Sequence, residues 1–137
     1  MLDTMLNTKE LYKMIIDTIL EKLYALNIPH KTLGFYIRSF HVNLPIYIIL
    51  FLVYGPKWLG LTILFFLILS FISLFVFKGC ILSKLEKKLD GEDIIIIDPL
   101  VYLLRLENNN NNRFYVSIFS GLLYVYLSVY IYHKRFN

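Results

Sequence analysis

The 137-residue sequence has little of several residue types that soluble domains use freely. It contains one cysteine, Cys80, and one alanine, Ala25, and only 18% of its residues are charged. A single cysteine allows no intrachain disulfide, which excludes a secreted framework held by disulfides. Ordinary soluble domains have about 25% charged residues, so this chain has few charges with which to cover a surface in water. Its 58% hydrophobic content excludes disorder, which needs low hydrophobicity.

Charge is absent from three long stretches, residues 39–55, 58–77 and 114–132, which have 17, 20 and 19 residues. A helix needs about 20 apolar residues, within a range of about 17–25, to cross the hydrocarbon core of a bilayer. The sequence therefore predicts an all-α integral membrane bundle with three transmembrane helices, in one domain that covers residues 1–137. Pro45 lies early in the first stretch and predicts a kink there.

An amphipathic helix is predicted over residues 8–26, before the first span. Apolar residues recur every three to four positions along it, and Asn7 with Glu10 fits a capping box at its start. Pro29 predicts its end, because the residue before a proline avoids the α conformation. Such a helix fits two positions: packed on the rest of the protein or a partner, or lying among lipid headgroups.

Residues 78–113 form a polar loop between the second and third spans. Within it, residues 81–89 have the pattern of a short basic amphipathic helix, and the four isoleucines at 94–97 favour an extended segment. Asp98, followed by a proline, is predicted to be the N-cap of a second short helix. The asparagine run at 108–112 is predicted to be a loop.

Lysine and arginine are distributed unevenly around these spans. Eleven lie before residue 39 or in the 78–113 loop, and three lie elsewhere. The positive-inside rule therefore predicts a cytoplasmic N-terminus and 78–113 loop, with the C-terminus on the opposite side. The basic residues do not cluster among aromatics, so no nucleic acid is expected as a partner. The expected partners are the lipid bilayer and other proteins or copies of this chain, bound through the transmembrane helices.

Sequence motifs for chemistry are missing. His30, His41 and His133 are far apart in the chain and no Cys pair accompanies them, which argues against a zinc site. The chain has no P-loop, G-x-G-x-x-G or G-x-S-x-G pattern. We therefore expect no catalytic, cofactor-binding or metal-binding residue, and no cofactor. The carboxylates between Glu86 and Asp98 are interpreted as a solvated loop that balances its own lysines.

Four residues at the membrane edge are candidates for more specific roles. Arg38, His41 and Asn43 are the polar residues nearest to a span interior. They fit interface anchors whose long side chains reach water, or a role linked to a ligand or a proton. Cys80 follows the second span, where S-palmitoylation occurs, and it equally fits a small apolar residue that faces a neighbour.

Small residues form a stripe on the third span, at Ser117, Gly121 and Ser128. Small side chains on one helix face let two backbones approach closely in lipid. These three residues are therefore candidates for helix packing.

A set of short motifs links the spans and the loop: His41, Gly79-Cys80, Leu85-Glu86 and Asp98-Pro99. In this pattern the chain resembles small multi-pass membrane proteins of giant, nucleocytoplasmic large DNA viruses, over residues 40–130. The resemblance implies a viral origin and a membrane location. It brings no known activity and therefore implies no catalytic residue.

Three functions remain open from the sequence. The first is a non-enzymatic membrane subunit or scaffold that presents its amphipathic helices to partners. The second is an oligomeric pore of viroporin type, lined by Thr62, Ser70, Ser73 and tyrosine hydroxyls. The third is a membrane enzyme that uses His41 or the acidic loop.

Overall fold

A computed structural model describes the chain from Leu2 to Asn137, with side chains described from Asn7 onward. It has six helices and, within residues 2–137, no strand. The helices are α1 (Leu2–Tyr24), α2 (His30–Tyr54), α3 (Lys57–Val76), α4 (Ile81–Asp90), α5 (Asp98–Leu103) and α6 (Asn110–Phe136). The all-α class is confirmed.

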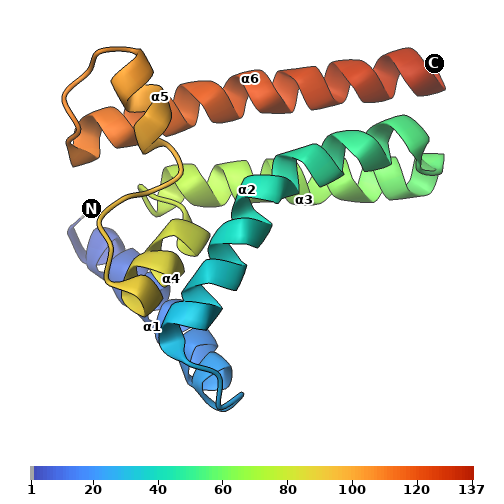
Figure 1. The fold of residues 1–137 in the computed structure, drawn as a ribbon. Helices are drawn as coiled ribbons and strands as arrows, with labels where there is room; N and C mark the ends of the chain where they lie inside the picture. The colour runs from blue at the N-terminus through green and yellow to red at the C-terminus, as the bar shows by residue number, and fades with distance from the viewer. Residues whose placement is uncertain (1) are drawn as a thin grey trace.

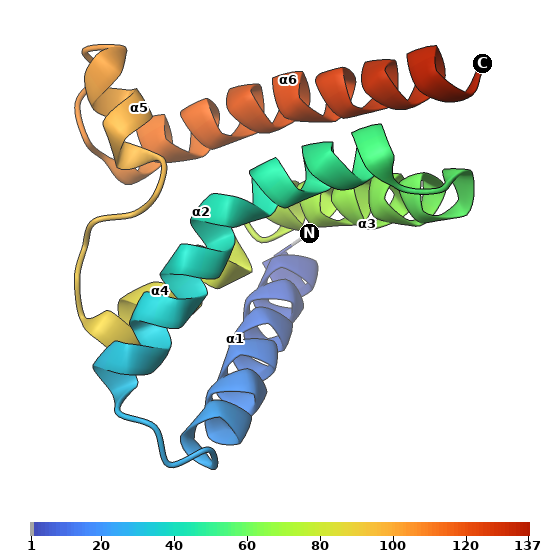
Figure 2. The same cartoon turned by 45° about the vertical axis from the view of Figure 1, so that its right-hand side comes forward.

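Three of the helices, α2, α3 and α6, are long and apolar enough to cross a membrane. They hold the charge-free stretches, so the expectation of three candidate spans is confirmed. Helices α3 and α6 run side by side, and the second half of α2 joins them (Figures 1 and 2). The α2–α3 turn and the C-terminus lie at one end of this bundle, whereas α5 and the start of α6 lie at the other.

Close contacts on α6 hold the bundle together. An ideal Cβ added to Gly121 would lie 3.0 Å from the Phe71 ring of α3, so a larger side chain there would push this ring away. Ser128 of α6 is fully buried. Two polar side chains of α6 bind carbonyls of α2: the Tyr124 hydroxyl donates to Pro45 at 2.7 Å, and Arg135 donates to Leu52 at 2.7 Å.

Helix α2 changes direction part-way along its length (Figure 1). Pro45 is its internal proline. Proline has no N–H to donate to the carbonyl four residues earlier, and its ring presses against that carbonyl, so a helix bends there. The residue four positions before Pro45 is His41. The bend therefore separates a bundle half of α2 from a half that turns away and carries His41.

The first half of α2 packs with α1 and α4 in a second lobe. Buried apolar side chains join the three helices: Tyr12, Ile16, Leu20, Leu33, Leu85 and Leu89. Helix α1 thus packs on the rest of the protein, the first of the two positions considered for it. The expected capping box is wrong, because the helix runs through Asn7. Its end before Pro29 is confirmed, since α1 stops at Tyr24.

A buried ion pair holds the 78–113 loop against the start of α6. Arg113 of α6 donates to both carboxylate oxygens of Asp98, each at 2.8 Å, and Asp98 is only 2% exposed. Asp98 also accepts from the backbone N–H of Ile95, and the isoleucine segment turns at Ile96 and Ile97. Asp98 is therefore the first residue of α5 and not its N-cap, which is Ile97.

The asparagine run is only partly a loop. Helix α6 begins inside it at Asn110, because the side chain of Asn109 accepts a hydrogen bond from the N–H of Asn112 at 2.8 Å. This is the N-cap arrangement that asparagine favours.

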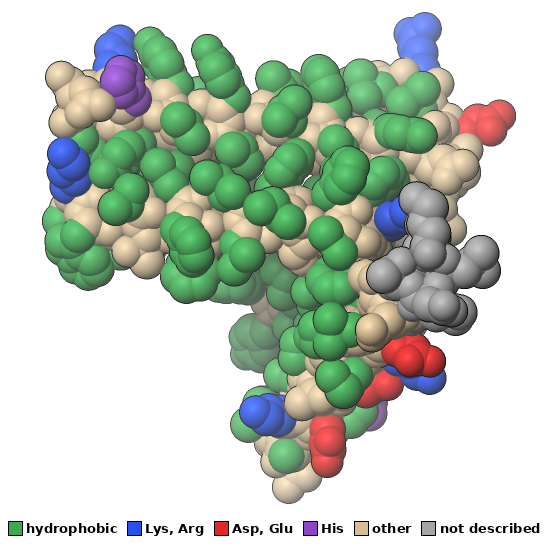
Figure 3. Space-filling model, turned by 180° about the vertical axis from the view of Figure 1, so that it is seen from behind, with side chains coloured by type: hydrophobic (Ala, Val, Ile, Leu, Met, Phe, Trp, Pro, Cys, Tyr) green, Lys and Arg blue, Asp and Glu red, His purple; other side chains and the backbone are tan. Residues whose placement is uncertain are grey.

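Hydrophobic side chains cover the length of the bundle, while charged side chains gather at its ends and on the second lobe (Figure 3). Large apolar residues of α3 are more than half exposed, among them Leu61, Phe65, Ile72 and Phe75. Exposed apolar area of this extent is typical of a membrane-facing surface.

Candidate active site

Cys80, His41 and Glu86 form a continuous chain of contacts between α2 and α4. The Sγ of Cys80 lies 3.6 Å from Nε2 of His41, within hydrogen-bond range for sulfur. The other ring nitrogen of His41, Nδ1, lies 2.8 Å from Oε1 of Glu86. A nucleophile, a base and a group that orients the base in this order are the arrangement used for covalent acyl transfer.

Local structure places each member. The chain leaves α3 through Lys78, whose positive φ of 50° and the bond from Gly79 N–H to the Leu74 carbonyl make a Schellman-type end. This turn directs Cys80 to the N-cap of α4, where the first helical N–H groups are free of helical partners. Glu86 lies on the same helix, and the bend in α2 brings His41 toward both.

Glu86 is held in place by its surroundings. Its side chain is 1% exposed, and its Oε2 lies 3.6 Å from Nε of Arg38, one turn before His41 on α2. Arg38 also pairs with Asp90 at 3.2 Å and with Glu92 at 3.1 Å. An ideal Cβ on Gly34 would lie 2.5 Å from Oδ1 of Asp90, so a larger side chain there would push this carboxylate away.

The electrostatics favour a thiolate at Cys80. Burial alone would raise the pKa of the thiol, but the hydrogen bond and charge of His41 and the backbone N–H groups of Ser83 and Leu82 outweigh it. The net effect lowers the Cys80 pKa. Tyr12 behaves in the opposite way: burial, and then the charge of Cys80, raise its pKa to about 12, so it stays neutral. Helix N-termini beside a histidine are where reactive cysteines occur.

A cavity of about 720 Å³ opens beside this cluster, within the size range of ligand sites. His41 and Cys80 line it, together with Tyr12 and Phe77. It continues along α6, where residues from Asn110 to Tyr124 form its wall. The candidate nucleophile and base thus share one hollow, as a reaction with a bound substrate requires.

The structure brings together some of the residues proposed from the sequence and not others. Arg38 and His41 both contact Glu86, and His41 also contacts Cys80. The amide of Asn43 instead donates within its own helix to the Ser39 carbonyl. Ser117 and Gly121 line the cavity. Ser128 is fully buried and does not line it.

The interpretation of the acidic residues as a solvated loop is wrong for two of them. Glu86 and Asp98 are buried, at 1% and 2% exposure, because each is bound by a cationic or imidazole side chain. Glu92 and Asp93 are exposed, as expected. Local sequence patterns do not predict the contacts among Cys80, His41 and Glu86, since 39 and 45 residues separate His41 from its two partners.

The residues that the structure describes contain no group of three or more His, Cys, Asp or Glu side chains arranged to hold a metal ion. The side chains of the cluster itself offer a thiol and an imidazole that can accept and return a proton.

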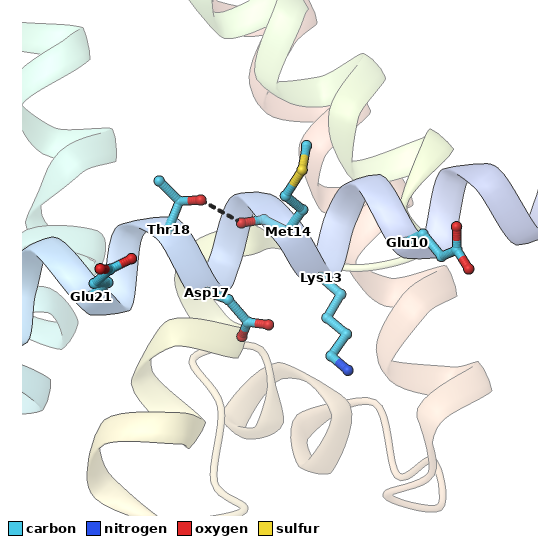
Figure 4. A pocket seen from close by; sticks show the side chains of 6 residues that line it. All are labelled: Glu10, Lys13, Met14, Asp17, Thr18 and Glu21. Atoms are coloured by element: carbon cyan, nitrogen blue, oxygen red, sulfur yellow. Dashed lines mark hydrogen bonds between the residues drawn. The ribbon is translucent and has the colours of Figure 1, made fainter.

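A second hollow, of about 390 Å³, lies on the outer side of α1 (Figure 4). Its walls come from α1 alone: Glu10, Lys13, Met14, Asp17, Thr18 and Glu21. The Thr18 hydroxyl donates to the Met14 carbonyl at 2.8 Å, within the helix. Residues on one exposed helix do not converge on a ligand, so the cavity at Cys80 is the candidate site.

Comparison with known proteins gives no relative for the chain: no family model, curated protein or solved structure matches it. The resemblance to giant-virus membrane proteins therefore stays a prediction.

Proposed function

We propose that the protein is a membrane-embedded, cysteine-dependent acyl hydrolase or acyltransferase. Cys80 is the nucleophile, His41 the general base and Glu86 the group that orients the imidazole. The observation that supports this most strongly is the unbroken contact from Sγ of Cys80 through both nitrogens of His41 to the buried Glu86.

The roles follow from the donor and acceptor atoms. The Nδ1–H group of His41 donates a hydrogen bond to Glu86. In this tautomer Nε2 carries no proton and faces the thiol. Nε2 then takes the thiol proton, and the imidazolium is stabilised by the carboxylate on its far side. The N–H groups of Leu82 and Ser83 at the start of α4 stabilise negative charge on the Cys80 sulfur.

The same geometry favours an enzyme over the other functions considered. A scaffold that presents amphipathic helices needs free apolar faces, yet Tyr12, Ile16 and Leu20 of α1 are buried against the rest of the second lobe. A pore needs free hydroxyls, yet the Thr62 hydroxyl donates to the Trp58 carbonyl at 2.9 Å within α3. Neither role uses a buried carboxylate aligned with a histidine and a thiol.

We also propose that α2, α3 and α6 cross the bilayer, with the 78–113 loop on the cytoplasmic side. The excess of Lys and Arg before residue 39 and within the loop supports this orientation. A reducing cytoplasm also keeps the single cysteine as a thiol, which the proposed chemistry requires.

Hydrolysis of a short activated ester, p-nitrophenyl butyrate, by the full chain in mild detergent tests the function. We expect turnover by the natural chain and none by Cys80→Ala. Ser70→Ala, at an exposed serine of α3 outside the cavity, is the matched control and keeps the natural rate. Equal rates for the natural chain and Cys80→Ala would contradict the proposal.

A further inference from the structure

The cavity at Cys80 is elongated along the bundle. Its wall on α6 extends from Asn110 to Tyr124, which spans about 21 Å at about 1.5 Å per residue. Cys80 and His41 lie on its loop side, and Leu74, Gly121 and Tyr124 line it further into the candidate spans. A lining of this length fits a long ligand whose reacting group lies at the level of Cys80.

The part of the cavity within the bundle offers little to a polar ligand. The Ser120 hydroxyl donates to the Val116 carbonyl at 2.7 Å, and the Tyr124 hydroxyl donates to the Pro45 carbonyl at 2.7 Å. Their hydrogen-bonding groups are therefore used within the protein. The small side chains at 117, 120 and 121 create the space, and Pro45, Leu74 and Phe114 make it apolar.

The loop side of the cavity is basic. Among its lining cations, Lys87 pairs with Asp93 and Arg113 pairs with Asp98. Lys78 and Lys84 also line it and have no carboxylate partner among the residues that the structure describes. The Lys84 ammonium lies 4.9 Å from the Tyr12 ring centroid and faces the site from one side. These two lysines are therefore available to bind an anionic group of a ligand at Cys80.

We propose that this cavity binds a long acyl chain carried on a phosphate-bearing head, with the acyl carbonyl at Cys80. The acyl ester of an anionic phospholipid is the substrate class that the observations favour. The inference rests on the proposed function and names its substrate: the chain lies among Pro45, Leu74, Ser120 and Tyr124, and the phosphate lies near Lys78 and Lys84.

The reaction balances with these groups alone. The Cys80 thiolate attacks the ester carbonyl, the new C–S bond forms and the ester C–O bond breaks. The leaving alkoxide takes the proton that His41 had received from the thiol. Water then attacks the thioester and gives a proton to His41. The C–S bond breaks, the fatty acid is released, and the Cys80 thiolate takes the proton back from His41.

The acyl-chain part is tested with the full chain in vesicles of anionic phospholipid. The readout is the ratio of its hydrolysis rates on long-chain and butyryl esters. Ser120→Phe fills the cavity, so we expect this ratio to fall by about tenfold or more. Ser70→Phe, the same change at an exposed serine outside the cavity, keeps the ratio. A ratio unchanged in Ser120→Phe would overturn the assignment.

The head-group part is tested by comparing anionic phosphatidylglycerol with zwitterionic phosphatidylcholine. We expect the natural chain to prefer the anionic lipid, and Lys78→Gln and Lys84→Gln each to reduce this preference by about fivefold. Long-chain acyl-coenzyme A, whose head also carries phosphate, is the second arm. Faster acyl transfer from acyl-coenzyme A than from phosphatidylglycerol would show that the phospholipid is not the acyl source. Equal rates on the two phospholipids would contradict the preference for an anionic head group.

Binding separates this inference from the proposed function. A phosphatidylglycerol with a photoreactive group on its acyl chain is added to the full-length Cys80→Ala variant, which cannot form the thioester. We expect labelling of the α6 segment 114–124, and loss of that labelling in Cys80→Ala with Ser120→Phe. Labelling of this segment without turnover by the natural chain would contradict the proposed enzymatic function alone. Turnover without labelling would contradict the proposed acyl-chain site alone.

Discussion

Nδ1 of His41 lies 2.8 Å from Oε1 of Glu86, although 45 residues separate them in the chain. Glu86 is almost completely buried, and burying a carboxylate is costly unless a partner compensates it. The pair therefore fixes both the position and the orientation of the imidazole. Its second nitrogen consequently faces Cys80, and the pair joins α2 to α4 within the second lobe.

The reactivity of Cys80 should depend on His41. Because the contact with His41 helps lower the Cys80 pKa, more thiolate exists at neutral pH than for an ordinary cysteine. We expect iodoacetamide to alkylate the natural chain with a rate profile shifted to lower pH, and His41→Gln to move the profile upward. Cys80 is the only cysteine, so total labelling reports this site alone. Superimposable profiles for the two proteins would argue against the contact.

Glu86→Gln should impair turnover more than binding. Glutamine keeps nearly the same shape but removes the charge that stabilises the imidazolium and can favour the wrong tautomer. We expect kcat for ester hydrolysis to fall about 10²- to 10⁴-fold with little change in KM. Glu92→Gln removes an exposed carboxylate that also contacts Arg38, and it serves as the control. A fall in kcat of the same size in both variants would assign the effect to Arg38 and not to His41.

The Asp98–Arg113 pair should be important for stability. Asp98 is buried and accepts from Arg113 through both oxygens, so Asp98→Ala leaves the guanidinium without its carboxylate counter-charge. We expect the free energy of unfolding in denaturant to drop by about 3–5 kcal/mol. Asp93→Ala, at an exposed aspartate paired with Lys87, should cost less than about 1 kcal/mol. Similar losses in the two variants would show that burial of the pair does not matter.

Acidification should loosen α1 from α4. The hydrogen bond and charge of Lys88 lower the Asp17 pKa below its ordinary value of 3.8. A carboxylate with a lowered folded pKa stabilises the fold above its unfolded pKa, and this contribution is lost as pH falls through the folded value. Amide exchange of α1 should therefore accelerate below about pH 4, beyond the intrinsic effect of pH. Lys88→Ala should remove this additional acceleration; if the variant keeps it, the pair is not its cause.

Local and compositional signals in the sequence were enough to predict the helical class and the candidate spans. The charge-free stretches identified α2, α3 and α6 because hydrocarbon excludes charge over a fixed length. Pro29 and Pro45 correctly marked a helix end and an internal helix proline, since proline acts on its own backbone. These features depend on neighbours in sequence and need no tertiary contact.

The site was not predictable in the same way. His41 and Cys80 were singled out separately, but only the packing of α2 on α4 brings them together. Glu86 was assigned to a solvated loop because its neighbours at Lys84, Lys87 and Lys88 are exposed and basic. Which face of α4 is buried depends on contacts with α1 and α2. A motif search within one segment does not detect such long-range proximity.

The most direct test of the central claim is the intact mass of the full chain after brief exposure to a long-chain acyl ester in anionic vesicles. We predict a hydroxylamine-sensitive acyl adduct on Cys80 that forms in the natural chain and builds up much more slowly in His41→Gln and Glu86→Gln. An adduct that forms at the same rate in all three proteins, or no adduct on Cys80 in the natural chain, would contradict acyl transfer by Cys80, His41 and Glu86.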